Sequence, residues 1–215
     1  MLANRTLMAA SSGANSLVFV GQSGTTTLPT GTAVGDYVIH CVYEDDTAPV
    51  VGDVTMTLIS SRSSNGREVG IWGGAMTSAA ISDGTLTYRG RTYTFRPSPG
   101  ASVSENDGGT STNNVSTNVV IDMTAYSDDA FAVIGAGAMD DQSVGGTGSF
   151  KTISQVPAFD DDHTITGGGP DDDGGAGYAV YSVGESPSSV TITATTQGSF
   201  DTSPILCTAV IGFSW

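Results

Sequence analysis

Positive charge is scarce in this sequence. Seven lysines and arginines stand against 22 aspartates and glutamates among 215 residues, which gives a formal net charge of -15 at pH 7. The only lysine is Lys151, and the six arginines are scattered between Arg5 and Arg96. Binding to nucleic acid needs a cluster of basic residues against the phosphates, and anionic lipid repels so acidic a chain. We therefore expect neither nucleic acid nor a membrane as a partner.

Long apolar runs are also missing. Residues 1–16 contain one arginine and only a short apolar patch, well short of the apolar core of a secretory signal. No stretch approaches the roughly 18 consecutive apolar residues of a membrane helix. A hydrophobic content of 38% is nevertheless enough to bury a core. These features predict a soluble protein made in the cytoplasm.

Cysteine is rare as well. Cys41 and Cys207 are the only two, and both lie in apolar segments that read as strands. Buried free cysteines behave as small hydrophobic residues and are the commoner case in a chain without a secretory signal. We expect two free thiols, with a disulfide between them as the alternative.

What the sequence does contain is the alternation of apolar and polar residues that is typical of β-strands. Helical spacing of apolar residues is absent, whereas Val190, Ile192 and Ala194 alternate with threonines, which predicts a strand with one buried and one exposed face. Residues 37–43 are largely apolar at both odd and even positions, and so on both faces, as is typical of a central strand. Residues 205–213 show the same pattern, so we expect the terminal Trp215 to be held against the fold.

Further strand candidates are separated by clusters of Gly, Ser, Asn, Asp and Pro. They are LVFV near Leu17, VTMTLI near Val54, REVGIWGGAM near Arg67, TLTY and RTYTF around Gly90, VVIDMTAY near Val119, AFAVIGAGAM near Phe131 and GYAVYSV near Gly177. Nine to eleven short, closely spaced strands predict an all-β antiparallel sandwich, in particular a jelly roll. We expect a tight hairpin at TYRGRTY with Gly90 at positive φ. The predicted organisation is an N-terminal arm, 1–16, and a single sandwich domain, 17–215.

Two long loops interrupt the predicted strands. Residues 96–114 have almost no apolar side chain, and residues 155–175 contain six of the 22 acids. Loops of more than about 12–15 residues are uncommon and are often functional. Asp160–Asp162 and Asp171–Asp173 flank the second loop's glycines and would supply Ca²⁺ ligands if they came together. The alternation of acids seen in calcium loops is missing, so a solvated acidic loop is the favoured interpretation.

Catalytic patterns are weak. His40 lies in an apolar segment, which favours a core or interface histidine over a general base. His163 lies in the acidic loop, and neither histidine has the spacing of a metal ligand. The acidic doublets are Asp45-Asp46, Asp128-Asp129 and Asp140-Asp141, and the segment GGTGS from Gly145 lacks the lysine of a phosphate loop. We predict no catalytic, cofactor-binding or metal-binding residue, and no enzyme.

The two tryptophans allow two interpretations. Trp72 and Trp215 would form a platform for a sugar ring if they were exposed. Both lie within segments that read as strands, so packing in the core is favoured.

Two parts of the chain resemble a known group of proteins. LPTGTAVGDYVIHCVYEDDTAP, followed later by GYAVYSV, SVTITATT and LCTAVIGFSW, is similar to small jelly-roll virion proteins of tailed bacteriophages. The resemblance covers Leu28 to about Ala79 and Gly177 to Phe213, although VVGDVTMTL replaces the Pro-x-Gly-Trp turn of that group after Pro49. It implies a structural role, without catalytic residues, as a capsid decoration (cement) protein or a tail-associated protein.

The acidic charge agrees with a place on the capsid exterior, away from packaged DNA. We expect a homotrimer that binds the major capsid protein and stabilises the shell, with residues 1–16 and the two long loops as contact elements. Two alternatives remain open: a tail or receptor-binding module that recognises a host glycan, and a carbohydrate-binding or adhesin-type sandwich.

Overall fold

The computed structural model shows an almost entirely β protein. It describes residues 15–24, 28–43, 49, 56–64, 67–77, 90–112, 116–126, 130–139, 149–157, 159–165, 173–197 and 204–215. The elements in these ranges are β1 (Leu17–Ser23), β2 (Tyr37–Tyr43), β3 (Thr57–Ser64), β4 (Arg67–Ala75), β5 (Gly90–Pro97), β6 (Ser102–Thr112), β7 (Ser116–Asp122), the 3-10 turn η1 (Thr124–Tyr126), β8 (Ala130–Met139), β9 (Ser149–Val156), β10 (Asp161–Ile165), β11 (Asp173–Tyr181), β12 (Ser189–Gln197) and β13 (Ile205–Ser214).

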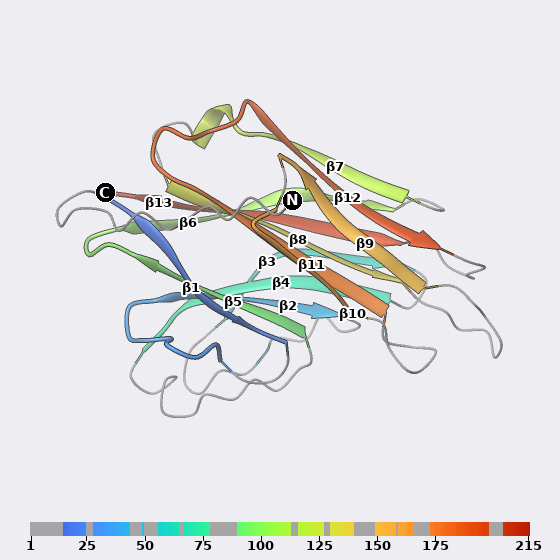
Figure 1. The fold of residues 1–215 in the computed structure, drawn as a ribbon, viewed down its shortest axis with the longest axis horizontal. Coiled ribbons are helices and arrows are strands. Elements are labelled where there is room, and N and C mark those ends of the chain that lie inside the picture. Colours follow the sequence, from blue (N-terminus) through green and yellow to red (C-terminus); the bar gives the residue numbers. More distant parts are fainter. Residues whose placement is uncertain are drawn as a thin grey trace, which may run out of the picture.

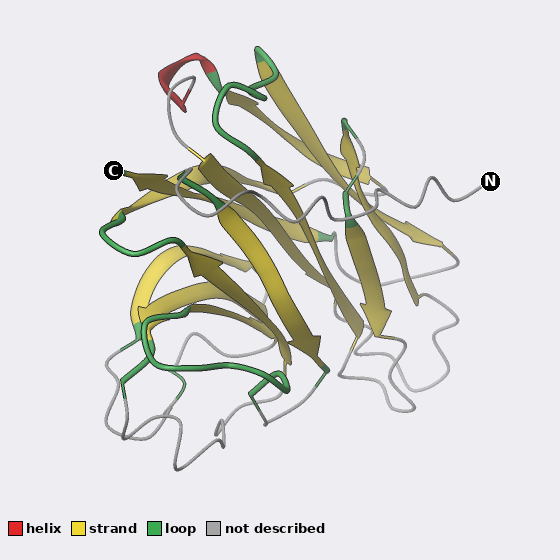
Figure 2. Ribbon diagram, turned by 60° about the vertical axis from the view of Figure 1, so that its left-hand side comes forward, coloured by secondary structure: helices red, strands yellow, loops and turns green. Residues whose placement is uncertain are grey.

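The strands form three antiparallel sheets stacked in three layers (Figures 1 and 2). The lower sheet in Figure 1 has the order β1-β5-β2-β4-β3, the middle sheet β10-β11-β8-β13-β6 and the upper sheet β7-β12-β9. The predicted all-β antiparallel sandwich is confirmed. The jelly-roll arrangement stays a prediction.

The middle sheet is apolar on both faces because it separates two cores. Along β8, Ala132 and Ile134 belong to the core against the lower sheet, whereas Phe131 and Val133 belong to the core against the upper sheet. All four side chains are fully buried. Strands buried on both faces require such near-continuous apolar sequences, which explains the segment AFAVIGAGAM.

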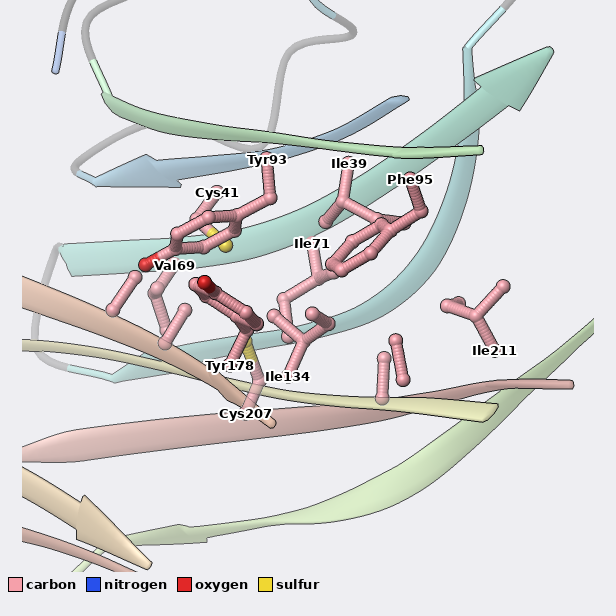
Figure 3. Packing of buried hydrophobic residues seen from close by; sticks show 14 of the residues in the cluster. Ile39, Cys41, Val69, Ile71, Tyr93, Phe95, Ile134, Tyr178, Cys207 and Ile211 are labelled. Carbon is pink, nitrogen blue, oxygen red and sulfur yellow. The ribbon is translucent and has the colours of Figure 1, made fainter. Parts of the chain in front are cut away.

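The lower core is built around aromatic rings. Tyr178 of β11 stacks on Phe19 with 4.3 Å between ring centroids and lies 4.9 Å from the ring of Tyr93. Figure 3 shows these layers facing each other, with Cys41 on the lower sheet and Cys207 on the middle sheet. Such rings bury large apolar areas and so contribute strongly to the stability of a core.

The upper core depends on a pair of glycines. Gly135 of β8 lies opposite Gly177 of β11, and the ring of Phe159 covers both. A Cβ atom at Gly177 would lie 2.5 Å from Cδ2 of Phe159. The missing side chains therefore allow Phe159 to pack directly on the backbone of the middle sheet.

Strand β2 is the third of the five strands in the lower sheet, as its two apolar parities predicted. Its outward residues Val38 and Val42 are buried with Trp72, and Leu28, Met56 and Met76 complete this third cluster. The outer surface of the lower sheet therefore has a small core of its own.

The prediction of two long loops is wrong. Residues 102–112 form β6, which pairs with β13 over ten positions, and the segment 155–175 contains the end of β9, all of β10 and the start of β11. The expected set lacked β6, β9 and β10, whereas β11 was expected as GYAVYSV and begins earlier, at Asp173. The predicted strand near Val54 begins later, at Thr57.

Strand β6 is polar because its side chains beside the lower sheet are largely exposed and make polar contacts rather than apolar ones. The Tyr37 hydroxyl donates to Glu105, Ser60 Oγ donates to Asp107 Oδ1 at 2.7 Å, and Arg62 Nε donates to Thr112 Oγ1 at 3.0 Å. These contacts close one side of the lower core. Alternation of apolar residues is therefore missing from a strand that nevertheless pairs with β13 along its length.

The predicted hairpin at Gly90 is also wrong. Gly90 is the first residue of β5, pairs with Val42 and is not among the glycines at positive φ. A Cβ atom there would lie 1.9 Å from the carbonyl oxygen of Cys41. The position needs glycine for close approach of two strands, not for a turn. The predicted strand TLTY lies outside the described residues.

The loop between β1 and β2 is held by an ion pair. Asp36 is 1% exposed, and Arg96 of β5 binds it through Nε and Nη2. Thr32 adds a hydrogen bond of 3.0 Å to Thr94 of β5. Residues 29–36 are thus fastened to the outer surface of the lower sheet.

The chain end is held, as predicted. Trp215 Nε1 donates to the carbonyl oxygen of Ser98 at 3.0 Å, and the Ser98 amide donates to the carbonyl oxygen of Ser16 at 2.8 Å. Of the predicted arm, residues 1–14 lie outside the described part of the chain, and β1 begins at Leu17.

Candidate interaction face

The structure places the predicted calcium residues along a hairpin rather than around one point. Asp162 lies opposite Gly177, whereas Asp173 is the first residue of β11. Four residues of strand separate these positions, about 13 Å at 3.3 Å per residue. Asp160 Oδ2 accepts a hydrogen bond from the Val180 amide at 2.7 Å, so this carboxylate fastens β10 to β11. Asp171 and Asp172 lie outside the described residues.

The histidines lie in two different strands. His40 is fully buried on the outward side of β2, with Nδ1 2.8 Å from Thr92 Oγ1, which agrees with a satisfied structural histidine. His163 belongs to β10, not to a loop, and pairs with Ala176. Within the described ranges, no three His, Cys, Asp or Glu residues come together in a way that could hold a metal ion.

Both cysteines are free and fully buried in the lower core. Burial raises the pKa of each thiol, strongly for Cys207. A protonated thiol is a poor nucleophile, so neither residue is suited to covalent chemistry.

The tryptophans differ from each other. Trp72 is 8% exposed and belongs to the outer cluster, as core packing predicted. Trp215 is 36% exposed at the chain end, so the prediction that it lies in the core is wrong. The acidic doublets at 45–46, 128–129 and 140–141 and the glycines at 145–148 lie outside the described residues.

A further surface feature is the outward side of the upper sheet. We call it the threonine face, and it consists of Ser116, Asn118, Val120 and Asp122 on β7, Thr191, Thr193 and Thr195 on β12, and Ser154 and Val156 on β9. The alternate residues of β7 and β12 point into the upper core. The wet face predicted for residues 190–195 is confirmed.

The threonine face is ordered in rows across the three strands. Thr193 lies between Asn118 and Ser154, and Thr191 lies between Val120 and Val156. The two valines are 62% and 71% exposed. An uncharged polar surface with exposed apolar groups costs less to desolvate than a charged one, so it is suited to contact with another protein.

Asp122 is the only charged residue of the threonine face, and it lies at the end of β7. Its Oδ1 accepts hydrogen bonds from the amide of Thr124 at 3.0 Å and from the Thr124 hydroxyl at 2.8 Å. These bonds lower the pKa of Asp122. The Asp122 carboxylate therefore stabilises the turn η1, and the other residues that define the threonine face are uncharged.

The fold and this face define a three-layered, antiparallel all-β protein whose three-stranded sheet has a nearly uncharged outward face. No protein family, curated protein or solved structure matches the chain. No helix among the described residues is long and apolar enough to cross a membrane.

Proposed function

We propose that the protein is a structural component of a virus particle, a decoration protein that binds the major capsid protein on the outside of the shell. In this role the threonine face is the docking surface, and the protein stabilises the shell by bridging neighbouring subunits. The protein is made in the host cytoplasm and has no catalytic role.

The observation that carries this proposal is the neutrality of the threonine face in a chain of charge -15. Among the residues that define this face only Asp122 is charged, and so neutral a set needs a reason in so acidic a protein. Protein contacts are depleted in charged residues at their centre, whereas sugar and ion sites are built around polar groups that converge on one point. The resemblance to phage virion proteins supports the capsid as the partner.

The remaining acidity suits the same setting. A negative outer surface keeps decorated particles apart in solution and lies on the far side of the shell from packaged DNA. Docking through the threonine face keeps acidic segments out of the contact, since β10, for example, belongs to the middle sheet.

The test is co-sedimentation with shells assembled from the major capsid protein of the same genome. Ser154→Lys places one positive charge in the middle row of the threonine face, and Ser61→Lys makes the same change at an exposed serine of β3. We expect Ser154→Lys to weaken binding at least tenfold, since a docked lysine must be desolvated. Ser61→Lys should bind like the unmodified protein. Absence of binding by the unmodified protein, or equal weakening by both variants, would contradict the proposal.

A second candidate function is recognition of a host glycan by a tail protein, and the exposed Trp215 favours it. The hydrogen bond from its indole to Ser98 fixes the ring, and a fixed aromatic ring is what stacking on a sugar requires. This alternative predicts binding to host surface glycans that Trp215→Ala abolishes, with no binding to capsid shells.

A further inference from the structure

Strand β7 is an open edge of the upper sheet. It pairs with β12 over seven consecutive residues without a register shift, and no described strand pairs with its other side. Among the described backbone hydrogen bonds outside the sheets, none involves residues 116–122. Figure 1 shows β7 at the outer margin of the molecule. Its free peptide groups form a template for another strand.

The other five edge strands are protected against such pairing. Register shifts leave an extra residue in four of them, Val20 in β1, Ile59 in β3, Gly108 in β6 and Lys151 in β9. The fifth edge, β10, contains Asp161 and Asp162. Bulges and charges are the usual means by which proteins prevent pairing at sheet edges. Only β7 among these edges is regular, bulge-free and almost uncharged.

We propose that β7 pairs antiparallel with β7 of a second copy of the chain, around a two-fold axis near Val119. The two upper sheets then become one continuous six-stranded sheet. This proposal goes beyond the capsid role and does not depend on it. It also replaces the three-fold assembly expected from the sequence with a two-fold one, because a strand paired with its own copy is an isologous contact.

Charge favours a copy of the same strand as the occupant. With Val119 on the axis, Asp122 lies opposite Ser116 of the second copy. The two Asp122 residues are then six residues apart along the strands, about 20 Å, which exceeds the screening length of roughly 8 Å at physiological salt. Two chains that each have a charge of -15 repel each other, so they associate most readily where acids are absent.

The side chains also match in this register. Asn118 lies opposite Val120 of the second copy, so the exposed valine gains a neighbour on the threonine face. On the inner side, Thr117 lies opposite Ile121 of the second copy, and the two upper cores become continuous. The joined sheet presents two threonine faces as one surface.

The experiment is sedimentation velocity over a range of protein concentrations. A contact between two seven-residue strands is smaller than the roughly 1,200 Å² of stable interfaces, so we expect a dimer that forms between about 1 μM and about 1 mM. Asn118→Lys with Val120→Lys sets like charges opposite each other across the axis, and should raise the dissociation constant at least tenfold. Asn118→Glu with Val120→Glu should do the same.

Mixing the two double variants gives the decisive result. Lysines then lie opposite glutamates, and we expect a heterodimer at concentrations at which each variant alone is monomeric. Ser61→Lys on β3 is the control and should leave the dimer unchanged. A monomer at every concentration, a dimer that survives the lysine double variant, or no heterodimer in the mixture would overturn the proposal. Since no capsid is present, these outcomes are independent of the capsid-binding test.

Discussion

Arg96 binds the buried carboxylate of Asp36 through two parallel hydrogen bonds, from Nε to Oδ1 at 2.6 Å and from Nη2 to Oδ2 at 2.8 Å. The same Nη2 donates to the carbonyl oxygen of Gly31 at 2.9 Å, and the Ala33 amide donates to Oδ2 of Asp36 at 2.7 Å. The side chain of Arg96 is 48% exposed and that of Asp36 is 1% exposed. Asp36 therefore has no access to water that could replace its partner, whereas Arg96 does.

This asymmetry predicts unequal effects of two substitutions. Arg96→Met leaves a buried carboxylate without its cation and should lower the free energy of unfolding by about 3 kcal/mol. Asp36→Asn leaves an arginine that can turn into solvent and should cost about 1 kcal/mol. Urea unfolding at pH 7 measures both. An equal or reversed order would contradict the assignment of the buried charge to Asp36.

The buried thiols should not react in the folded protein. Since the thiolate is the nucleophile and burial raises the pKa of Cys41 and Cys207, we expect no reaction with Ellman's reagent at pH 8. In guanidinium chloride, two thiols per chain should react. One or no reactive thiol after unfolding would reveal a disulfide.

The same thiols make the fold sensitive to alkali. Each has a folded-state pKa above its unfolded value of about 8.5, so the unfolded chain loses its proton first as pH rises. Stability is therefore complete below about pH 8.5 and falls above it by up to about 1.4 kcal/mol per pH unit for each thiol. Tyr37, whose pKa burial also raises, adds to the loss above about pH 10. Cys41→Ala should make the decline shallower in urea unfolding between pH 8 and pH 10.

The glycine under Phe159 should not accept a side chain. Gly177→Ala would set a methyl group 2.5 Å from Cδ2 and 2.6 Å from Cε2 of Phe159, and should destabilise the protein by about 2 kcal/mol. Phe159→Leu should itself be destabilising because it removes buried ring atoms. Combined with Gly177→Ala it should cost less than the sum of the two changes, and thermal unfolding of the four proteins measures this coupling. Strict additivity would mean that Phe159 does not fill the space above Gly177.

Calcium should have no effect on stability. The described members of the two acidic triplets lie along a hairpin, and Asp160 is engaged with the Val180 amide. We expect the same melting temperature in EDTA and in about 5 mM Ca²⁺, because the described residues gather no group of carboxylates that could hold a metal ion. A rise in calcium that EDTA reverses would show that the triplets do come together.

The sequence predicted those strands in which apolar residues recur regularly because they pack on an apolar core. Val190, Ile192 and Ala194 are fully buried as expected, and β2 is central because both its parities are apolar. Strand β6 was missed because Glu105 and Asp107 are exposed and form hydrogen bonds with polar partners on the lower sheet. Alternation reports burial by apolar neighbours and does not detect a strand that is satisfied by hydrogen bonds.

The third layer was not predicted, although a signal for it was present. AFAVIGAGAM is apolar at odd and even positions over its whole length, which requires a packed layer on each face of the strand. The neutral face was visible in the threonines of β12, but its extent was not. The residues that complete it, such as Asn118 and Ser154, come from strands 36 positions apart in the chain, and only the pairing with Thr193 joins them.

The hydrogen bonds of Ser98 to both Ser16 and Trp215 make the chain a candidate for circular permutation. Ser16 and Trp215 both form hydrogen bonds with this one residue, so the first strand starts where the last strand ends. A linker of a few glycines would connect Trp215 to Ser16, and new ends could be opened at an exposed turn such as Gly184, between β11 and β12. Such a circular permutant would keep every described strand intact, since no strand contains the new break at Gly184 or the new join.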